Sequence, residues 1–114
     1  MKKLIVERPW GHFDQFTKNE DTTVKLHFVK PQSAWSMQYH NHRSEFWRII
    51  SGSAIITIGD KKIEANPGDE FFVEKGERHR LESGDKEVVL LEICYGEFDE
   101  EDIVRIEDKY GRVI

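Results

Sequence analysis

Short runs of apolar and β-branched residues alternate with glycine- or proline-bearing turn sequences along this 114-residue chain. The clearest turns are SGS at 51–53, GDK at 59–61, NPGD at 66–69, KGE at 75–77 and SGDK at 83–86. Runs of this kind between such turns predict strands, here over 24–30, 33–40, 46–51, 53–58, 62–65, 70–74, 78–83 and 87–95. No long segment keeps the 3.6-residue apolar period of a helix, and only a short helical turn around 99–104 is expected.

Short strands at this spacing are typical of an all-β sandwich or barrel. A chain of 114 residues is long enough for one hydrophobic core and too short for two ordinary domains. No internal repeat, linker or low-complexity tract interrupts the strand pattern. We therefore expect a single all-β domain over residues 1–114.

The run from Val88 to Tyr95 is apolar on both faces except at Glu92. A strand of this kind lies between two sheets or at a subunit contact. A lone carboxylate inside it must be paired, hydrogen-bonded or functional, because an isolated buried charge is very costly. Glu92 is therefore equally a satisfied core carboxylate or a site residue, while Cys94 is expected to be a buried, inert thiol.

Composition and charge disfavour several classes of function. The chain has 38% hydrophobic and 34% charged residues, as soluble globular proteins do. Its net charge is −5 without a basic stripe, so nucleic-acid binding is disfavoured, and the acids of 97–108 are expected to be mostly solvated. No apolar run is long enough for a bilayer or a signal-peptide core, which predicts a cytoplasmic protein without membrane partners.

Potential metal ligands gather in the stretch QYHNHRSEFW, residues 38–47. Alternation along a strand would place Gln38, His40 and His42 on one face. Glu45 has the opposite parity and joins them only through a bulge or a hairpin between His42 and Glu45. Imidazole nitrogen with carboxylate oxygen suits Zn²⁺, Fe²⁺, Mn²⁺, Co²⁺ or Ni²⁺.

A further ligand is expected from His79, which lies in GDEFFVEKGERHRLES at 68–83. The two stretches together resemble the paired motifs of the cupins. The first motif has HxH, a glutamate, six residues and a glycine, and Glu45 and Gly52 match that gap. In the second motif Gly68, Gly76 and His79 fall in register, although Glu74 replaces the usual proline and Ser83 the usual asparagine.

QYHNHRSEFW followed by its SG turn closely resembles the cupin domain of type II phosphomannose isomerases, which also forms the C-terminus of bifunctional mannose-1-phosphate guanylyltransferases. The stretches ERPWG, HRLE and EDIVRIEDKYGR agree with that family as well. The resemblance implies a double-stranded β-helix barrel with one divalent metal, zinc being favoured. The implied ligands are His40, His42 and His79, with Gln38 or Glu45 completing the set.

The reaction that the resemblance implies is the interconversion of mannose 6-phosphate and fructose 6-phosphate through an enediol. Such a reaction needs an oxyanion stabiliser, a base and a phosphate anchor. Glu92 is a candidate base, and Glu45 is the alternative. The sequence lacks a glycine-rich phosphate loop near its start, so GTP-dependent chemistry is not expected.

The candidate substrate-binding residues stand in the matched motifs. A guanidinium fork suits phosphate, which selects Arg43, Arg105 and Arg112. Tyr110 is expected to hydrogen-bond the substrate. Trp47 shares the parity of Glu45 and is either a stacking platform for the sugar or plain core.

The sequence leaves two alternative functions open and predicts one protein partner, a second copy of the chain. The chain could instead bind a sugar phosphate or sugar nucleotide without catalysis, or be a metal-dependent cupin oxygenase. The apolar strand at 88–95 is compatible with a homodimer. Trp10, in the N-terminal arm, is expected to pack over the barrel or over a partner subunit, whereas His12 and His27 are assigned structural or surface roles.

Overall fold

The computed structural model describes residues 3–107 and 110, and this part of the chain contains eleven strands and no helix. The strands are β1 (Leu4–Arg8), β2 (Gly11–Gln15), β3 (Thr22–Val29), β4 (Met37–Tyr39), β5 (Arg43–Ser51), β6 (Ala54–Ile58), β7 (Lys61–Ala65), β8 (Glu70–Val73), β9 (His79–Ser83), β10 (Val88–Gly96) and β11 (Val104–Glu107). The all-β prediction is confirmed. Among the described residues, no helix is a candidate for crossing a membrane.

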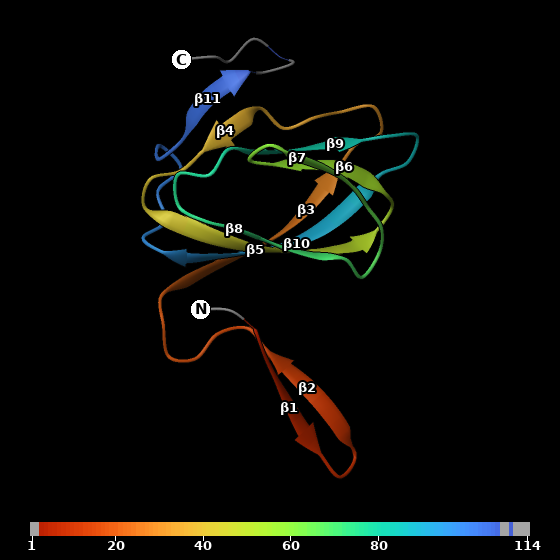
Figure 1. Cartoon of the computed structure of the whole chain (residues 1–114), viewed down its shortest axis with the longest axis vertical. Coiled ribbons are helices and arrows are strands. Elements are labelled where there is room, and N and C mark those ends of the chain that lie inside the picture. Colours follow the sequence, from red (N-terminus) through yellow and green to blue (C-terminus); the bar gives the residue numbers. More distant parts are fainter. Residues whose placement is uncertain (1–2, 108–109, 111–114) are drawn as a thin grey trace.

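Two antiparallel sheets face each other to form the barrel (Figure 1). One has the strand order β3-β10-β5-β8, and the other has the order β11-β4-β9-β6-β7. Between them the inward side chains form a dry core, consisting of Val29, Trp47, Ile49, Ala54, Ile56, Ala65, Val73, Leu81, Val88 and Leu90. This core holds together the two sheets whose strands carry the polar residues of the site.

The structure contains the predicted strands with small shifts of their ends, except for the strand expected over 33–40. Only Met37–Tyr39 forms a strand there, and Ala34 makes an isolated bridge to Glu82. The short turn expected around 99–104 is present, with the N–H of Asp102 donating to the backbone oxygen of Asp99 at 3.0 Å, but it is not helical and leads into β11. The acidic composition of 97–108 concealed this last strand.

The prediction of a hairpin between His42 and Glu45 is also wrong. β4 belongs to the five-stranded sheet, whereas β5 belongs to the four-stranded sheet. Residues 40–42 therefore cross from one sheet to the other, and the alternation of a continuous strand does not apply to them. This crossing brings His40 inward and leaves His42 exposed.

Two motif glycines have local structural reasons. Gly52 has a φ of +77°, and a Cβ there would lie 2.3 Å from the backbone oxygen of Glu87. Only glycine fits this turn without moving the backbone. Gly76 also has a positive φ, of +78°, and its N–H donates to the backbone oxygen of His40 at 2.7 Å. The second motif is thereby tied to the first.

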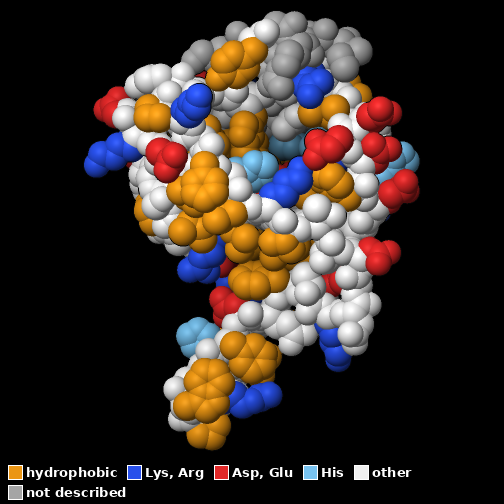
Figure 2. Space-filling view, turned by 180° about the vertical axis from the view of Figure 1, so that it is seen from behind, with side chains coloured by type: hydrophobic (Ala, Val, Ile, Leu, Met, Phe, Trp, Pro, Cys, Tyr) orange, Lys and Arg blue, Asp and Glu red, His pale blue; other side chains and the backbone are white. Residues whose placement is uncertain are grey.

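The N-terminal residues form a hairpin, β1–β2, that projects away from the barrel (Figure 1). Its apolar side chains are uncovered: Leu4 is 52%, Ile5 61% and Trp10 73% exposed. Trp10 therefore does not pack over its own barrel. Hydrophobic side chains crowd the tip of this hairpin in Figure 2.

Strand β10 is central, with β3 on one side and β5 on the other. Its inner face carries Glu92 toward the barrel interior. On its outer face Ile93 and Tyr95 pack in a second cluster with Phe16, Phe46 and Phe72. The prediction that this strand is covered on both faces holds for that end of it, but the neighbouring outer face of β3 stays exposed at Val24, Leu26 and Phe28.

Candidate metal centre

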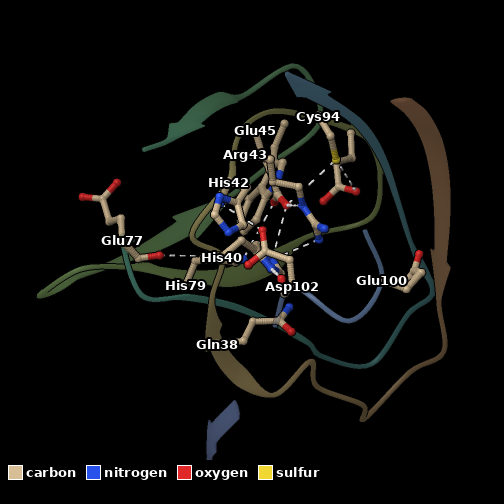
Figure 3. Close-up of polar contacts among 12 residues, drawn as sticks. Gln38, His40, His42, Arg43, Glu45, Glu77, His79, Cys94, Glu100 and Asp102 are labelled. Carbon is tan, nitrogen blue, oxygen red and sulfur yellow. Dashed lines mark hydrogen bonds and ion pairs between the residues drawn. The ribbon is translucent and has the colours of Figure 1, made fainter. Parts of the chain in front are cut away.

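Three ligand-type side chains from separate elements converge inside the barrel (Figure 3). His40 follows β4, Glu45 lies on β5, and His79 begins β9. The Nε2 atom of His40 lies 3.4 Å from Oε2 of Glu45, and Nε2 of His79 lies 3.7 Å from Oε1 of Glu45. All three residues are buried, with 3%, 1% and 1% exposure. Two imidazoles thus face one carboxylate in a site shielded from water.

Backbone carbonyls orient both imidazoles. The Nδ1 atom of His40 lies 2.6 Å from the carbonyl oxygen of Asp102, and Nδ1 of His79 lies 2.9 Å from the carbonyl oxygen of Glu77. A carbonyl can only accept, so each Nδ1 carries the hydrogen and each Nε2 presents its lone pair toward Glu45. Metal-binding histidines are commonly held in this way.

An unsatisfied buried atom shows that the cluster fits a cation. Nε2 of His79 is buried and has no hydrogen-bond partner in the described part of the chain. Burial lowers the pKa of His79 to about 4 and also lowers the pKa of His40. Both rings are therefore neutral at neutral pH, which is the form that ligates a metal. The residues present fit a divalent ion held by His40, Glu45 and His79.

Arg43 is buried beside these ligands. Its Nε donates to Oε2 of Glu45 at 2.9 Å, and one terminal nitrogen lies 3.2 Å from Nε2 of His40. The other terminal nitrogen donates to the backbone oxygen of Asp99, and the guanidinium packs on Phe98 at 4.6 Å. The guanidinium predicted to anchor phosphate is therefore engaged with the ligand residues.

Glu45 and Glu92 form a closely coupled pair of buried carboxyl groups. Burial raises the pKa of Glu45, and the nearby Glu92 raises it further against the opposing effect of Arg43. Burial would raise the pKa of Glu92 too, but hydrogen bonds involving His27 and Glu45 outweigh it and lower that pKa. The two carboxyl groups are thus shifted in opposite directions, the pKa of Glu45 upward and that of Glu92 downward.

A cavity of about 180 Å³ lies next to the cluster. In Figure 2 histidine and basic side chains meet in a hollow in the upper half of the molecule. The polar residues that line the cavity are Lys25, His27, Ser36, Gln38, His40, Arg43, Glu92, Glu100 and Arg105. Nε of Arg105 is buried without a hydrogen-bond partner in the described residues.

The structure separates the first-motif residues that the sequence grouped. His42 is exposed, and its backbone N–H donates to Oδ2 of Asp102 at 2.9 Å, so it stands apart from the three-residue cluster. Gln38 lines the cavity, where its Oε1 accepts from the Ser36 hydroxyl at 3.1 Å. Ligand roles for His42 and Gln38 remain predictions.

The predicted substrate-binding residues Trp47 and Tyr110 also lie apart from each other. Trp47 has no exposed surface; its Nε1 donates to Oε1 of Glu45 at 3.0 Å and its ring meets His79 edge-on at 5.3 Å. Stacking of a sugar on Trp47 would need a face that this packing covers. Tyr110 is 56% exposed and lines a different hollow from the cavity beside the cluster. Arg112 lies outside the described residues.

Sequence reasoning missed the part played by Asp102. Its carboxylate accepts the backbone N–H groups of Asn41 and His42, both at 2.9 Å, and its carbonyl accepts from His40. Asp102 thus braces the crossing segment that carries the first ligand. Its position in the matched stretch EDIVRIEDKYGR was the available signal, but its acidic neighbours suggested a solvated surface.

The comparison with protein families matches residues 2–108 to the family described as mannose-6-phosphate isomerase, C-terminal. The chain belongs to this family. The match includes every residue of the metal cluster and the cavity. The resemblance in the sequence motifs is therefore confirmed at the level of the family.

Two similar relatives are a xanthan biosynthesis protein and a mannose-1-phosphate guanylyltransferase. The xanthan biosynthesis protein XanB of Xanthomonas campestris pv. campestris is 38% identical over 109 residues, 94% of this chain and 23% of that protein. The mannose-1-phosphate guanylyltransferase ManC of Salmonella typhimurium is 37% identical over 110 residues, 95% of this chain and 23% of that protein. The chain spans less than a quarter of the length of either relative.

Solved structures identify the barrel as a cupin fold. The capsular polysaccharide assembling protein CapF of Staphylococcus aureus matches with a TM-score of 0.66 and 21% identity, over 94% of this chain and 33% of that one. A cupin protein of Bacteroides fragilis matches with a TM-score of 0.61 and 21% identity, over 71% of this chain and 74% of that one. At this identity the likeness shows the fold alone.

Proposed function

We propose that the chain is a metal-dependent isomerase that interconverts mannose 6-phosphate and fructose 6-phosphate. The observation that carries this proposal is the opening of a buried His–Glu–His cluster, through His40, onto a cavity that Arg105 also lines. The family description supports mannose 6-phosphate as the substrate. A cytoplasmic location, expected from the sequence, remains a prediction.

The chain's own residues supply the binding functions that this reaction needs. Arg105 and Lys25 line the cavity and would bind the phosphate by charge-assisted hydrogen bonds. His40, Glu45 and His79 would hold one divalent cation, zinc being favoured over manganese, iron, cobalt or nickel. When bound, that ion supplies a positive charge that stabilises the oxyanion formed during enolisation.

The proposal is tested by NMR of mannose 6-phosphate in D₂O with metal-loaded protein. We expect fructose 6-phosphate to form and deuterium to appear at C2, and both signals to vanish in His40→Ala. Unphosphorylated mannose should show neither signal, because nothing would occupy the position of the phosphate. His12→Ala, which removes an exposed histidine of the hairpin, should leave both signals unchanged.

Binding of the sugar phosphate without deuterium exchange would contradict catalysis and favour a non-catalytic sugar-phosphate or sugar-nucleotide module. Absence of both binding and exchange, with the metal fully loaded, would remove mannose 6-phosphate as the ligand. A metal-dependent oxygenase would instead consume O₂ when given a small organic acid. The two-histidine, one-carboxylate cluster would also suit a non-haem iron oxygenase, whereas the cavity arginine, Arg105, favours the isomerase.

We further propose that a second copy of the chain covers the exposed outer face of β3. The same chain carries two uncovered apolar surfaces, this face and the projecting β1–β2 hairpin. A two-stranded hairpin is at best marginally stable alone in water, so it needs a partner surface. β3 is also an edge strand, with one side open for pairing. The hairpin of one copy is thus expected to pack on β3 of the other.

Phe28→Asp is expected to convert a dimer into a 13.5 kDa monomer, because it places a charge on the apolar contact surface. Light scattering coupled to size exclusion measures the mass. Lys62→Asp on β7 changes charge on the other sheet and should leave the dimer intact. A monomeric native protein, or a dimer that survives Phe28→Asp, would contradict this arrangement.

A further inference from the structure

A histidine outside the metal cluster faces the same cavity. His27 lies on β3, and its Nε2 is 3.2 Å from Oε1 of Glu92 on the neighbouring strand β10. The two side chains differ in access to water, since that of His27 is 27% exposed and that of Glu92 only 6%. Both line the cavity that His40 and Arg105 also line. The sequence assigned His27 only a structural or surface role.

The antiparallel register explains why this pair meets. His27 is paired with Leu90, and Glu92 is paired with Lys25, so His27 and Glu92 are diagonal neighbours on the inner face of the sheet. The ring of Trp35 packs against the imidazole with centroids 4.8 Å apart. The position of His27 is thus fixed by the carboxylate and by an aromatic ring, without contact to the metal cluster.

The hydrogen bond also fixes which nitrogen of His27 is available. Oε1 of Glu92 also accepts from the Cys94 thiol at 3.4 Å, so this carboxylate oxygen is an acceptor and Nε2 of His27 is assigned the hydrogen. Nδ1 is left with its lone pair, and within the described part of the chain no other hydrogen bond to the ring is present. A carboxylate behind an imidazole orients the ring and balances the charge that the ring gains with a proton.

Three of the four carboxylate oxygens of the other candidate bases make contacts inside the protein. Oε1 of Glu92 is shared between His27 and the Cys94 thiol, at 3.2 and 3.4 Å. The two oxygens of Glu45 accept from Trp47 and Arg43. Of these three described candidates, His27 is the most exposed and lines the cavity, and its Nδ1 has no hydrogen-bond partner in the described residues.

We propose that His27 is the general base of the isomerisation and that Glu92 is its positioning residue. The proposal rests on the isomerase function proposed above. Nδ1 of His27 accepts the proton from C2 of the open-chain sugar, the C–H electron pair forms the C1–C2 double bond, and the carbonyl electrons move onto O1. The same nitrogen returns the proton to C1, while the O2 proton passes to O1 and O2 becomes the carbonyl. No oxidant, reductant or co-reactant is needed.

The test uses metal-loaded protein and the variants His27→Gln, His27→Asn and Glu92→Gln. Loss of a general base costs about 10²–10⁴-fold, and we expect kcat and C2 deuterium exchange to fall by that factor in both His27 variants. Binding of a hexitol 6-phosphate, which has no carbonyl, should stay unchanged, as should metal content and Tm. His12→Gln is the matched control and should keep full kcat.

Glu92→Gln should lower kcat with little change in KM, because the amide can donate to Nε2 and allow the other tautomer. Nitrogen NMR of the His27 ring reads this directly: the native ring should be protonated at Nε2 and the variant ring at Nδ1. A purely structural Glu92 would leave the tautomer unchanged, which would overturn its assigned role.

The outcomes separate this proposal from the one it rests on. A native protein without C2 exchange would remove the isomerase function and the base together. Native exchange that persists undiminished in His27→Gln and His27→Asn would overturn the base alone. Loss of metal or of fold in both His27 variants would mark the ring as structural and would also overturn the assignment.

Discussion

His79→Ala is expected to weaken metal binding by more than about 100-fold and to abolish isomerase activity. Removing even a partner that only orients a ligand costs 10–100-fold in affinity, and His79 is proposed as a ligand itself. Its Nε2 is one of the buried atoms without a hydrogen-bond partner in the described residues, and a cation would satisfy it. The remaining pair, His40 and Glu45, leaves the ion with too few protein ligands.

Metal content after dialysis, and competition with a chromogenic chelator, measure this loss. His42→Ala is the control that discriminates, because the sequence predicts His42 as a ligand while the structure leaves it exposed. We expect His42→Ala to bind metal as the native protein does. Equal loss in the His42 and His79 variants would restore the ligand set predicted from sequence and contradict the geometry described above.

Trp47→Ala is expected to lower the free energy of unfolding by about 3–5 kcal/mol. Trp47 is fully buried and packs edge-on against both Trp35 and His79, at 5.4 and 5.3 Å. Truncation opens a cavity in the core and removes the hydrogen bond to Glu45. Natural domains have a total stability of roughly 5–15 kcal/mol, so a substantial unfolded fraction is expected.

Urea unfolding followed by far-UV circular dichroism gives the free energy from the midpoint and slope. Trp10→Ala is the matched control: Trp10 is 73% exposed, and we expect a change within about 0.5 kcal/mol. Trp47→Phe keeps most of the ring and should cost less, mainly the lost hydrogen bond of about 1 kcal/mol. A Trp47→Ala protein as stable as the native one would show that the ring does not support the core.

Most strands could be predicted from the sequence, because the alternation of apolar and polar residues and the turn residues are local signals. The runs that became β5, β6, β8, β9 and β10 carry β-branched or aromatic residues between glycine-bearing turns. The hairpin β1–β2 was missed because LIVER is short and the following RPWG suggested an arm. The last strand was missed because acidic residues dominate its surroundings, although its pairing with β4 requires no apolar face.

The site residues likewise divide into those that local sequence patterns predict and those that they do not. His40, Glu45 and His79 could be named from the spacing of the two motifs, since spacing survives whatever path the backbone takes. The choice of His42 depended on a continuous strand, and the chain instead changes sheets at that point. Asp102 and His27 could not be selected, because their partners lie 60 or more residues away in the chain.

The sequence by itself determined the all-β class and the family, and it predicted a ligand set of His40, His42 and His79 with Gln38 or Glu45. These follow from local alternation, turn chemistry and motif spacing. Only the tertiary structure decided that Arg43 pairs with Glu45, that Trp47 is core, and that His27 meets Glu92 beside the cavity. Contacts between sheets and across strands depend on register and on where the chain crosses, and no local pattern encodes either.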